Sequence, residues 1–590
     1  MSQADPGGGP DRLVAALRRS HVLHGFDDAE VATVAGIAML VEIDAGDTVV
    51  EQGSPGDALY LIIEGDAEVV RDGRAAAKLS AGDFFGEMAM FNRAERVAAV
   101  RALERLQLVA IDDGRLQALM LRQDPAATKL VQQLGTLTIE RMQDTDAQLQ
   151  ARLAPQDPAL AVDLAQHQQL HRQLLAGWAL TYHAVGKPGK IGVNSTKPSA
   201  TAADLSVAYS PGVAQPCLAI RDDPEAAYAY TSKGHLVGVI SNGSAVLGLG
   251  NIGALASKPV MEGKAVLFKR FADVDAFDLE VDEGDPAAFV DTVVRIAPTF
   301  GGINLEDIAA PDCFWIEQEC QRRLDIPVMH DDQHGTAIIV GAGLLNALEL
   351  VGKRVEDVRV VFSGAGAAGF ASALHLLALG IAPGNLILTD IDGVVHRGRV
   401  LPDYLRPLAV DTSLRTLADA IVDADVFVGV SAAGVLTPAM LQSMARDPIV
   451  FALANPVPEI DPGLAGQTRS DVLVATGRSD HANQVNNVLA FPYVFRGALD
   501  VRATAIDEHM KRAATTAIAN LARQPVDADA GFDPAGLSYG PGYLIPKPFD
   551  RRLLPEVATA VAAAAMESGL ARQPVELSAY RDQLTGAPRL

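Results

Sequence analysis

A glycine-rich segment between a strand-like run and a helix-like run constrains the fold most. The apolar run Val358–Phe362 precedes Ser363-Gly-Ala-Gly-Ala-Ala-Gly369, and a helix-like run follows. A second strand-like run ends at Asp390, about 20 residues further on, the usual distance for an acid that binds a ribose. Such glycines let the backbone approach a pyrophosphate at a helix N-terminus. The predicted dinucleotide site comprises Gly364, Gly366, Ala367, Ala368, Gly369 and Asp390. A glycine turn without a ligand is the alternative.

The residues around Asp390 bear on the choice between NAD and NADP. Asp390 would repel a 2′-phosphate, and Asp392 adds negative charge nearby, so the sequence leans weakly to NAD. His396, Arg397 and Arg399 follow closely and could hold that phosphate instead.

The run and turn patterns predict a multidomain chain. From 35 to 112, short strand-like runs alternate with Gly-Asp turns, which indicates an antiparallel β-roll. Residues 115–180 have helical spacing. Later strand-like runs alternate with helix-length segments, as in a Rossmann-type doubly wound parallel sheet within an α/β region. Asn242-Gly243 between apolar runs predicts a β-hairpin.

Six segments are expected in this chain of 590 residues, which is too long for one core. They are a disordered tail (1–12), a roll domain (13–125), a helical linker (126–177), a first catalytic domain (178–337), a Rossmann-type domain (338–575) and a C-terminal tail (576–590).

Composition excludes several classes of protein. The formal net charge of -24 argues against binding to nucleic acid, whose affinity rests on Lys and Arg. Three cysteines are too few for a disulfide framework, which fits a reducing compartment. We expect no signal peptide, because the N-terminus lacks a basic and an apolar region. The apolar stretch near 336–348 is too short for a membrane span, so a cytoplasmic protein is expected.

Two acidic pairs follow strand-like runs upstream of the glycine motif. They are Glu306-Asp307 and Asp331-Asp332. Neighbouring carboxylates on a strand point to opposite sides, so usually only one of a pair serves a site unless the backbone turns. Carboxylates suit Mg²⁺ or Mn²⁺. Solvated loop acids are the alternative, although the apolar flanks place these pairs at the edge of a core.

Residues from about 178 to 575 resemble the bacterial type of malic enzyme. The matching stretches are Ala208–Ala214, Gly248–Gly253, Lys258–Lys264, Glu306-Asp307, His330–Thr336, Ala454–Pro456, Asn483–Asn487 and Ile545–Asp550. The resemblance implies oxidative decarboxylation of malate to pyruvate and CO₂ with NAD or NADP, and a homo-oligomer. It also implies that Glu306, Asp307 and Asp332 bind Mg²⁺ or Mn²⁺.

The same resemblance implies the remaining roles. Lys264 would take the C2 hydroxyl proton, with Asp331 orienting it, and Tyr209 would protonate C3 after decarboxylation. Asn455 would hold cofactor or substrate, and Asn486 and Asn487 would hold substrate. Animal-type relatives carry an arginine where this chain has Ser244-Ala245-Val246, so the clamp for the C1 carboxylate is unassigned. The phosphotransacetylase-like extension of many bacterial relatives is not expected.

The segment Gly82–Ala102 resembles the phosphate-binding cassette of cyclic-nucleotide-binding domains. In that family Glu87 would bind the ribose 2′-hydroxyl and Arg96 the cyclic phosphate, with Gly86 and Val97 beside the ligand. The resemblance implies regulation by a cyclic nucleotide such as cyclic AMP. A degenerate domain with a structural or dimerisation role is the alternative.

Three other functions remain open. A cyclic-nucleotide domain could precede a DNA-binding segment in a transcription regulator, but the charge and the enzyme-like remainder speak against this. The enzyme could instead only dehydrogenate a hydroxy acid or only decarboxylate oxaloacetate. The chain could also be an inactive dinucleotide sensor.

Overall fold

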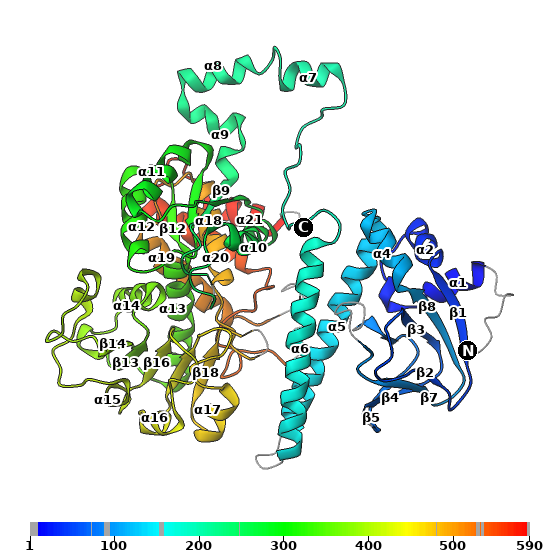
Figure 1. The fold of residues 1–590 in the computed structure, drawn as a ribbon. Helices are drawn as coiled ribbons and strands as arrows, with labels where there is room; N and C mark the ends of the chain where they lie inside the picture. The colour runs from blue at the N-terminus through cyan, green and yellow to red at the C-terminus, as the bar shows by residue number, and fades with distance from the viewer. Residues whose placement is uncertain are drawn as a thin grey trace. The chain divides into compact units, whose positions relative to one another are not determined.

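In a computed structural model, the protein consists of two compact units, residues 1–189 and residues 190–590. Figure 1 shows the fold. The structure describes residues 10–71, 73–87, 95–152, 158–246, 248–478, 481–526, 532 and 536–586. The following paragraphs treat each unit by itself.

The first unit contains two four-stranded sheets, with the strand orders β1-β8-β3-β6 and β2-β7-β4-β5. All neighbours in them pair antiparallel, as a β-roll requires. The strands are β1 (Ala38–Ile43), β2 (Thr48–Val50), β3 (Ala58–Glu64), β4 (Ala67–Arg71), β5 (Arg74–Leu79), β6 (Phe84–Phe85), β7 (Ala99–Ala102) and β8 (Leu106–Asp112).

Helices precede and follow the strands of these sheets along the chain. They are α1 (Pro10–Leu17), α2 (Asp28–Ala35), α4 (Asp113–Leu121), α5 (Pro125–Arg152) and α6 (Pro158–Ala184), with the 3₁₀ turn η1 (His21–Leu23). The prediction of a disordered tail over 1–12 is wrong for its last residues, because α1 begins at Pro10 and buries Ala16 and Leu17. Residues 1–9 lie outside the described part of the chain.

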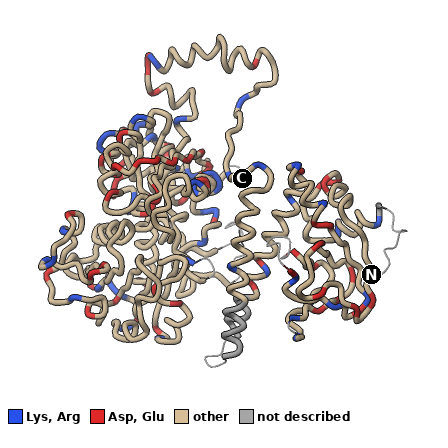
Figure 2. Tube along the Cα trace, viewed as in Figure 1, with Lys and Arg blue, Asp and Glu red and all other residues tan. Residues whose placement is uncertain are grey.

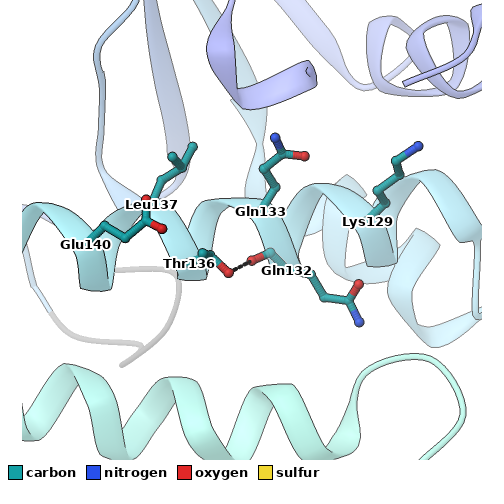
Figure 3. Close-up of a pocket in the computed structure, with 6 residues that line it drawn as sticks. All are labelled: Lys129, Gln132, Gln133, Thr136, Leu137 and Glu140. Carbon is teal, nitrogen blue, oxygen red and sulfur yellow. Dashed lines mark hydrogen bonds between the residues drawn. The ribbon is translucent and has the colours of Figure 1, made fainter. Parts of the chain in front are cut away.

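A hollow runs along one face of α5 (Figure 3). Its lining residues are of polar type apart from Leu137, and the Thr136 hydroxyl donates to the Gln132 carbonyl oxygen. The lining residues are Lys129, Gln132, Gln133, Thr136, Leu137 and Glu140. None of them is a predicted site residue.

The second unit contains two sheets with buried strands. One is parallel throughout, in the order β10-β9-β11-β12, and the other has the order β15-β14-β13-β16-β17-β18 with only β15 antiparallel. The strands are β9 (Leu236–Ser241), β10 (Asp275–Glu280), β11 (Gly302–Leu305), β12 (Val328–His330), β13 (Val360–Ser363), β14 (Leu386–Asp390), β15 (Gly393–Val394), β16 (Val426–Gly429), β17 (Ile449–Ala452) and β18 (Leu473–Thr476).

The six-stranded sheet confirms the predicted Rossmann-type topology. Every residue of β13, β16 and β17 is buried, since a parallel sheet is covered on both faces. Helices α13 (Asp331–Val351) and α14 (Ala367–Ala378) belong to the large core that this sheet shares.

The other helices of the second unit complete its layers. They are α7 (Ala202–Ala208), α8 (Ala214–Asp222), α9 (Ala227–Tyr230), α10 (Ala254–Ala272), α11 (Pro286–Ile296), α12 (Asp312–Arg323), α15 (Leu417–Ile421), α16 (Pro438–Ser443), α17 (Pro462–Thr468), α18 (Phe491–Asp500), α19 (Glu508–Arg523), α20 (Leu553–Glu567) and α21 (Leu577–Gly586). The 3₁₀ turns are η2 (Pro224–Ala226), η3 (Ser232–His235), η4 (Ala297–Thr299), η5 (Pro383–Asn385), η6 (Asp403–Leu408) and η7 (Asn487–Leu489).

One local prediction is wrong in this unit. No β-hairpin forms around Asn242-Gly243 in the described residues, because β9 pairs in parallel with β10 and β11 instead. Gly243 has φ +68° and approaches the backbone of Gly253, so the turn leads into α10. The predicted C-terminal tail begins with α21, which buries Tyr580 and Leu584.

One described helix, α13, is apolar and long enough to cross a membrane, but two thirds of its most apolar window is buried inside the protein. This burial is typical of a core helix. Figure 2 shows Lys and Arg interspersed with Asp and Glu along the described chain.

Candidate active site

Two neighbouring parallel strands deliver the acidic pairs to one edge of a sheet. Strand β11 ends at Leu305, directly before Glu306 and Asp307, and β12 ends at His330, directly before Asp331 and Asp332. Leu305 and His330 are paired in register, so the two acidic pairs meet at the carboxyl ends of the strands.

The backbone turns at both pairs, which removes the alternation of a strand. Asp307 has φ +52°, and Asp331 and Asp332 form the first turn of α13, where negative charge favours the helix dipole. The Asp307 N–H donates to the Asp332 carboxylate at 2.8 Å. Carboxylate oxygens of Glu306, Asp307 and Asp332 consequently lie within 4.8 Å of one another.

Lys264 reaches this edge from α10. The helix buries Met261, Lys264 and Phe268 along one stripe, so the lysine occupies a core position and is only 7% exposed. Its Nζ lies 2.6 Å from Asp331 Oδ2 and 2.8 Å from Glu306 Oε1. It also stands 4.2 Å from the centre of the Phe491 ring. The predicted base and its predicted orienting acid are therefore in direct contact.

One ammonium cannot balance four carboxylates in this site. Burial alone would lower the pKa of Lys264, but Asp331 and Glu306 outweigh it and raise that pKa well above its ordinary value. Burial raises the pKa of Glu306 and of Asp331 to about 7 each, and that of Asp332 to about 6. The site thus carries surplus negative charge that a cation would relieve.

Behind the acidic pairs lies a buried group that the sequence reading missed. Glu317 of α12 accepts the His330 N–H at 2.9 Å and contacts His334 Nε2 at 3.0 Å. Its carboxylate thereby fixes the end of β12 and the first turn of α13. The available signal was an acid on the apolar stripe of α12, which also contains Cys313 and Cys320.

The three predicted asparagines have different surroundings. Asn487 donates to Asp331 Oδ2, which places it in the Lys264 cluster. Asn486 caps η7 by accepting the Val488 N–H, a structural contact. Asn455 follows β17, and its carbonyl oxygen lies beside Gly248.

Tyr209 does not join the Lys264 cluster. It caps the C-terminus of α7, its residue exposure is 74%, and none of the described ion pairs, hydrogen bonds or ring contacts links it to Lys264. Its catalytic role stays a prediction.

The glycine motif has the geometry of a phosphate cradle. Gly364 has φ +111°, and a Cβ there would meet the Val430 carbonyl oxygen. A Cβ on Gly369 would meet the Gly364 carbonyl oxygen, so the helix packs closely on the turn. Nothing lies within 4 Å of the Cβ position at Gly366, the residue before α14. Open space at this helix start, with Ala367 and Ala368 in the first turn, fits a dinucleotide pyrophosphate.

The Asp390 carboxylate is occupied by the protein. Its Oδ1 accepts the Asp392 N–H at 2.8 Å, and its Oδ2 pairs with Arg399 Nη2 at 2.5 Å. Asp390 lies at the end of β14 as predicted, but its charge is paired with Arg399, which weakens its repulsion of a 2′-phosphate and with it the sequence argument for NAD.

In the first unit, the predicted cyclic-nucleotide residues lie together. Arg96 is buried and donates to the carbonyl oxygens of Gly86 and Ala58 at 3.1 and 2.7 Å. Glu87 is buried as well, and burial raises its pKa. Val97 follows Arg96 and is partly exposed. Residues 88–94 of the cassette lie outside the described part of the chain.

The residues of both candidate sites in the second unit have the chemistry that their predicted ligands need. The cluster of Glu306, Asp307 and Asp332 offers hard oxygen donors, which Mg²⁺ and Mn²⁺ prefer. The glycine cradle offers open space at a helix N-terminus. In the first unit, Arg96 Nε is a buried donor without a hydrogen-bond partner among the described residues, which suits an anion.

Three family models match the chain. Malic enzyme, N-terminal domain, matches residues 188–288, and Malic enzyme, NAD binding domain, matches residues 333–532. Cyclic nucleotide-binding domain matches residues 40–123.

Individual relatives agree with these matches. An NADP-dependent malic enzyme from Halomonas elongata is 58% identical over 399 residues, which cover 67% of this chain and 94% of the relative. An NAD-dependent malic enzyme from Rhizobium meliloti is 53% identical over 411 residues, which cover 69% of this chain and 53% of the relative. The chain thus spans about half the length of that second relative.

A solved structure extends the likeness to three dimensions. The malic enzyme from Pyrococcus horikoshii superposes with a TM-score of 0.64 at 43% identity, over 70% of this chain and 95% of that one. The strand-edge acids with Lys264, the glycine cradle and these matches lead to one conclusion: the chain belongs to the malic enzyme family and carries a cyclic nucleotide-binding domain before its two malic enzyme domains.

Proposed function

We propose that the protein carries out metal-dependent oxidative decarboxylation of L-malate with NADP in the cytoplasm, under control of a cyclic nucleotide. The contact of Lys264 with Asp331 and Glu306, beside the three-carboxylate cluster, carries this proposal. In it a candidate base and a candidate metal site share one strand edge.

Glu306, Asp307 and Asp332 would hold Mg²⁺ or Mn²⁺. When bound, the dication acts as a Lewis acid on the oxygen at C2, and the dinucleotide accepts the hydride. The residues of the chain then handle protons. Lys264 would take the C2 hydroxyl proton. The negative charge of Asp331 and Glu306 raises the pKa of Lys264, and a bound dication would offset that charge and so lower this pKa. Asp331 would orient Lys264 with the help of Asn487, since Lys264 and Asn487 both donate to Asp331 Oδ2.

Tyr209 would return a proton to C3 once CO₂ has left. Because its side chain is exposed, this role requires Tyr209 to approach the Lys264 cluster from α7. Asn455 would contact the nicotinamide end or the substrate from the end of β17. A homo-oligomer also stays a prediction.

NADP is proposed in place of the NAD that the sequence favoured. A 58% identical relative is named NADP-dependent, and Asp390 is neutralised by Arg399. A relative at 53% identity is named NAD-dependent, so family membership alone leaves the choice open.

Absorbance at 340 nm with L-malate, Mn²⁺ and either dinucleotide tests this proposal. We expect metal-dependent reduction of NADP with stoichiometric release of CO₂. Reduction without CO₂ would indicate a plain dehydrogenase, and CO₂ release from oxaloacetate without malate oxidation would indicate a decarboxylase. Folded, metal-loaded protein that does neither would support the inactive sensor.

The second proposal concerns the first unit. Gly86, Glu87 and Arg96 would bind a cyclic nucleotide such as cyclic AMP, and its binding would change the rate of malate oxidation. Arg96 is buried, and its Nε has no hydrogen-bond partner among the described residues, which supports binding of a cyclic phosphate.

Calorimetric titration of the full chain with cyclic AMP tests the binding step. Arg96→Gln should abolish binding, whereas Arg101→Gln, at the exposed position of β7, should leave it unchanged. Binding without any change in the rate would retain the site and reject the regulation. No binding by wild-type protein would reject both.

A further inference from the structure

We propose that Arg399 decides which dinucleotide the protein binds, by neutralising Asp390 and offering its guanidinium to the 2′-phosphate of NADP. This inference rests on the proposed use of NADP. An aspartate at the end of β14 would by itself favour NAD. In this proposal the side chain of Arg399 reverses that preference in favour of NADP.

The first observation is that the charge of Asp390 is already paired within the protein. An acid at this position selects NAD by accepting hydrogen bonds from the ribose hydroxyls. Here Oδ1 accepts the Asp392 N–H and Oδ2 pairs with Arg399. The side chains of Asp390 and Arg399 are only 18% and 17% exposed, so this pair is part of the folded loop rather than a surface contact.

The second step is the way in which Arg399 closes the loop. Asp390 pairs with Gly393 in the β14–β15 turn. Arg399 Nη1 donates to the carbonyl oxygens of Gly393 and Val394 at 3.3 and 3.4 Å. The guanidinium is therefore held at the end of β14, on the side where a doubly wound sheet receives the adenosine ribose.

The third step concerns Asp392. Its carboxylate lies 3.2 Å from Arg399 Nη2 but is 74% exposed, whereas Asp390 is largely shielded from solvent. An exposed ion pair is weak. A 2′-phosphate could replace Asp392 on Arg399 without breaking the Asp390 pair, because guanidinium binds phosphate through several donors at once. Asp392 thus occupies in the free protein the place that we assign to the phosphate.

The loop is also connected to the phosphate cradle. The Tyr404 hydroxyl donates to the carbonyl oxygen of Ala365, within the glycine turn, at 3.1 Å. The Gly364 N–H donates to Thr389, the residue before Asp390. The cradle for the pyrophosphate and the Asp390–Arg399 pair are therefore adjacent, as one bound dinucleotide requires.

The test compares binding of 2′,5′-ADP and 5′-AMP to the full-length, metal-free protein by calorimetry, so that no turnover is needed. Wild type should prefer 2′,5′-ADP. Arg399→Gln should lower its affinity for 2′,5′-ADP about 10- to 100-fold and change the affinity for 5′-AMP by less than about 3-fold. Asp392→Asn should raise the 2′,5′-ADP affinity about 3-fold by removing the competing charge.

Two further variants keep the test decisive. Arg406→Gln removes an exposed arginine of η6 that pairs only locally with Asp403, and it should alter neither affinity. Arg399→Lys keeps the charge but loses the planar donor fork, and it should fall between wild type and Arg399→Gln. An intermediate affinity in Arg399→Lys would distinguish a lost phosphate contact from unfolding of the loop in Arg399→Gln.

Three results would overturn the proposal. Equal losses for both ligands in Arg399→Gln and Arg399→Lys would make Arg399 a loop clamp without selectivity. A wild-type preference for 5′-AMP would also refute the proposal. If the protein then oxidised malate with NAD, the proposed malic enzyme activity would still hold. Lower 2′,5′-ADP affinity in Asp392→Asn would show that Asp392 supports the site. Conversely, selective 2′,5′-ADP binding without malate turnover would reject only the proposed function.

Discussion

The Lys264 cluster and the Tyr209 segment (residues 202–230, with α7, α8 and α9) differ in how the fold holds them. Lys264, Glu306 and Asp331 are buried and fix one another through contacts below 3 Å. The Tyr209 segment has no buried residue in α7, α8 or α9, and Figure 1 shows it extending away from the sheets of its unit. The proposed reaction nevertheless draws a base from the first region and an acid from the second.

This difference shows that one reaction can use some residues that also stabilise the fold and others that contribute little to its stability. Changing a buried, paired charge leaves its partners uncompensated in a poorly hydrated place. Changing an exposed side chain away from such contacts usually alters stability by less than about 0.5 kcal/mol. Activity and stability should therefore change together in the cluster and separately in the Tyr209 segment.

Lys264→Ala should give the largest effect. Loss of a general base lowers kcat about 10²- to 10⁴-fold, and loss of the buried ammonium should cost about 3–5 kcal/mol of unfolding free energy. Steady-state kinetics with L-malate and urea unfolding measure the two quantities. Lys269→Ala, on the same helix but half-exposed, should change neither appreciably. A kcat near wild type would remove Lys264 from the mechanism.

Asp332→Asn tests the metal site within the same buried cluster. The asparagine can still accept the Asp307 N–H, but it withdraws one negative charge from the cation. We expect Mn²⁺ affinity to fall by more than about 100-fold. Substitution of a residue that only orients a metal ligand typically lowers the affinity by about 10- to 100-fold. Titration followed by electron paramagnetic resonance measures this. Asp312→Asn, at the start of α12, serves as the control, and equal affinities in both variants would exclude Asp332 as a ligand.

Tyr209→Phe examines the exposed side of the comparison. Removing only the hydroxyl should lower kcat about 10²-fold through loss of a proton donor. The thermal midpoint should stay within 1 °C or so of wild type, since the residue is exposed. Full activity would show that the proton comes from elsewhere. A large drop in stability would mean that the segment is packed in the working protein, which would break the comparison itself.

The pH dependence of metal binding should be the smallest of these effects. The pKa values of Glu306 and Asp332 in the metal-free protein are raised to about 7 and about 6, mainly by burial. A dication binds their deprotonated forms, so its affinity should rise with pH and level off above about pH 8. A Mn²⁺ titration from about pH 6.2 to about pH 7.5 should show about a 10-fold increase. A flat profile would mean that these carboxylates are already ionised at the lower pH.

The sequence by itself determined the topology of the main sheet and which residues to propose for the site. Continuous apolar runs specify strands buried on both faces, which made the Rossmann-type sheet predictable from residues such as Val360–Phe362. The glycine spacing and the acidic pairs after strands are local, so their chemistry could be read without knowing distant contacts. The resemblance supplied Lys264, which composition alone would have left as a surface residue.

Only the tertiary structure decided what depends on long-range contacts. The Asn242-Gly243 turn suits a hairpin locally, yet β9 has its parallel partners β10 and β11 far along the chain. Asp390 has the right spacing for a ribose acid, but Arg399 occupies its carboxylate. Glu317 supports β12 and α13 from another helix. In each case the deciding partner is brought near by packing, and the electrostatics of a carboxylate depend on such neighbours more than on its position in a motif.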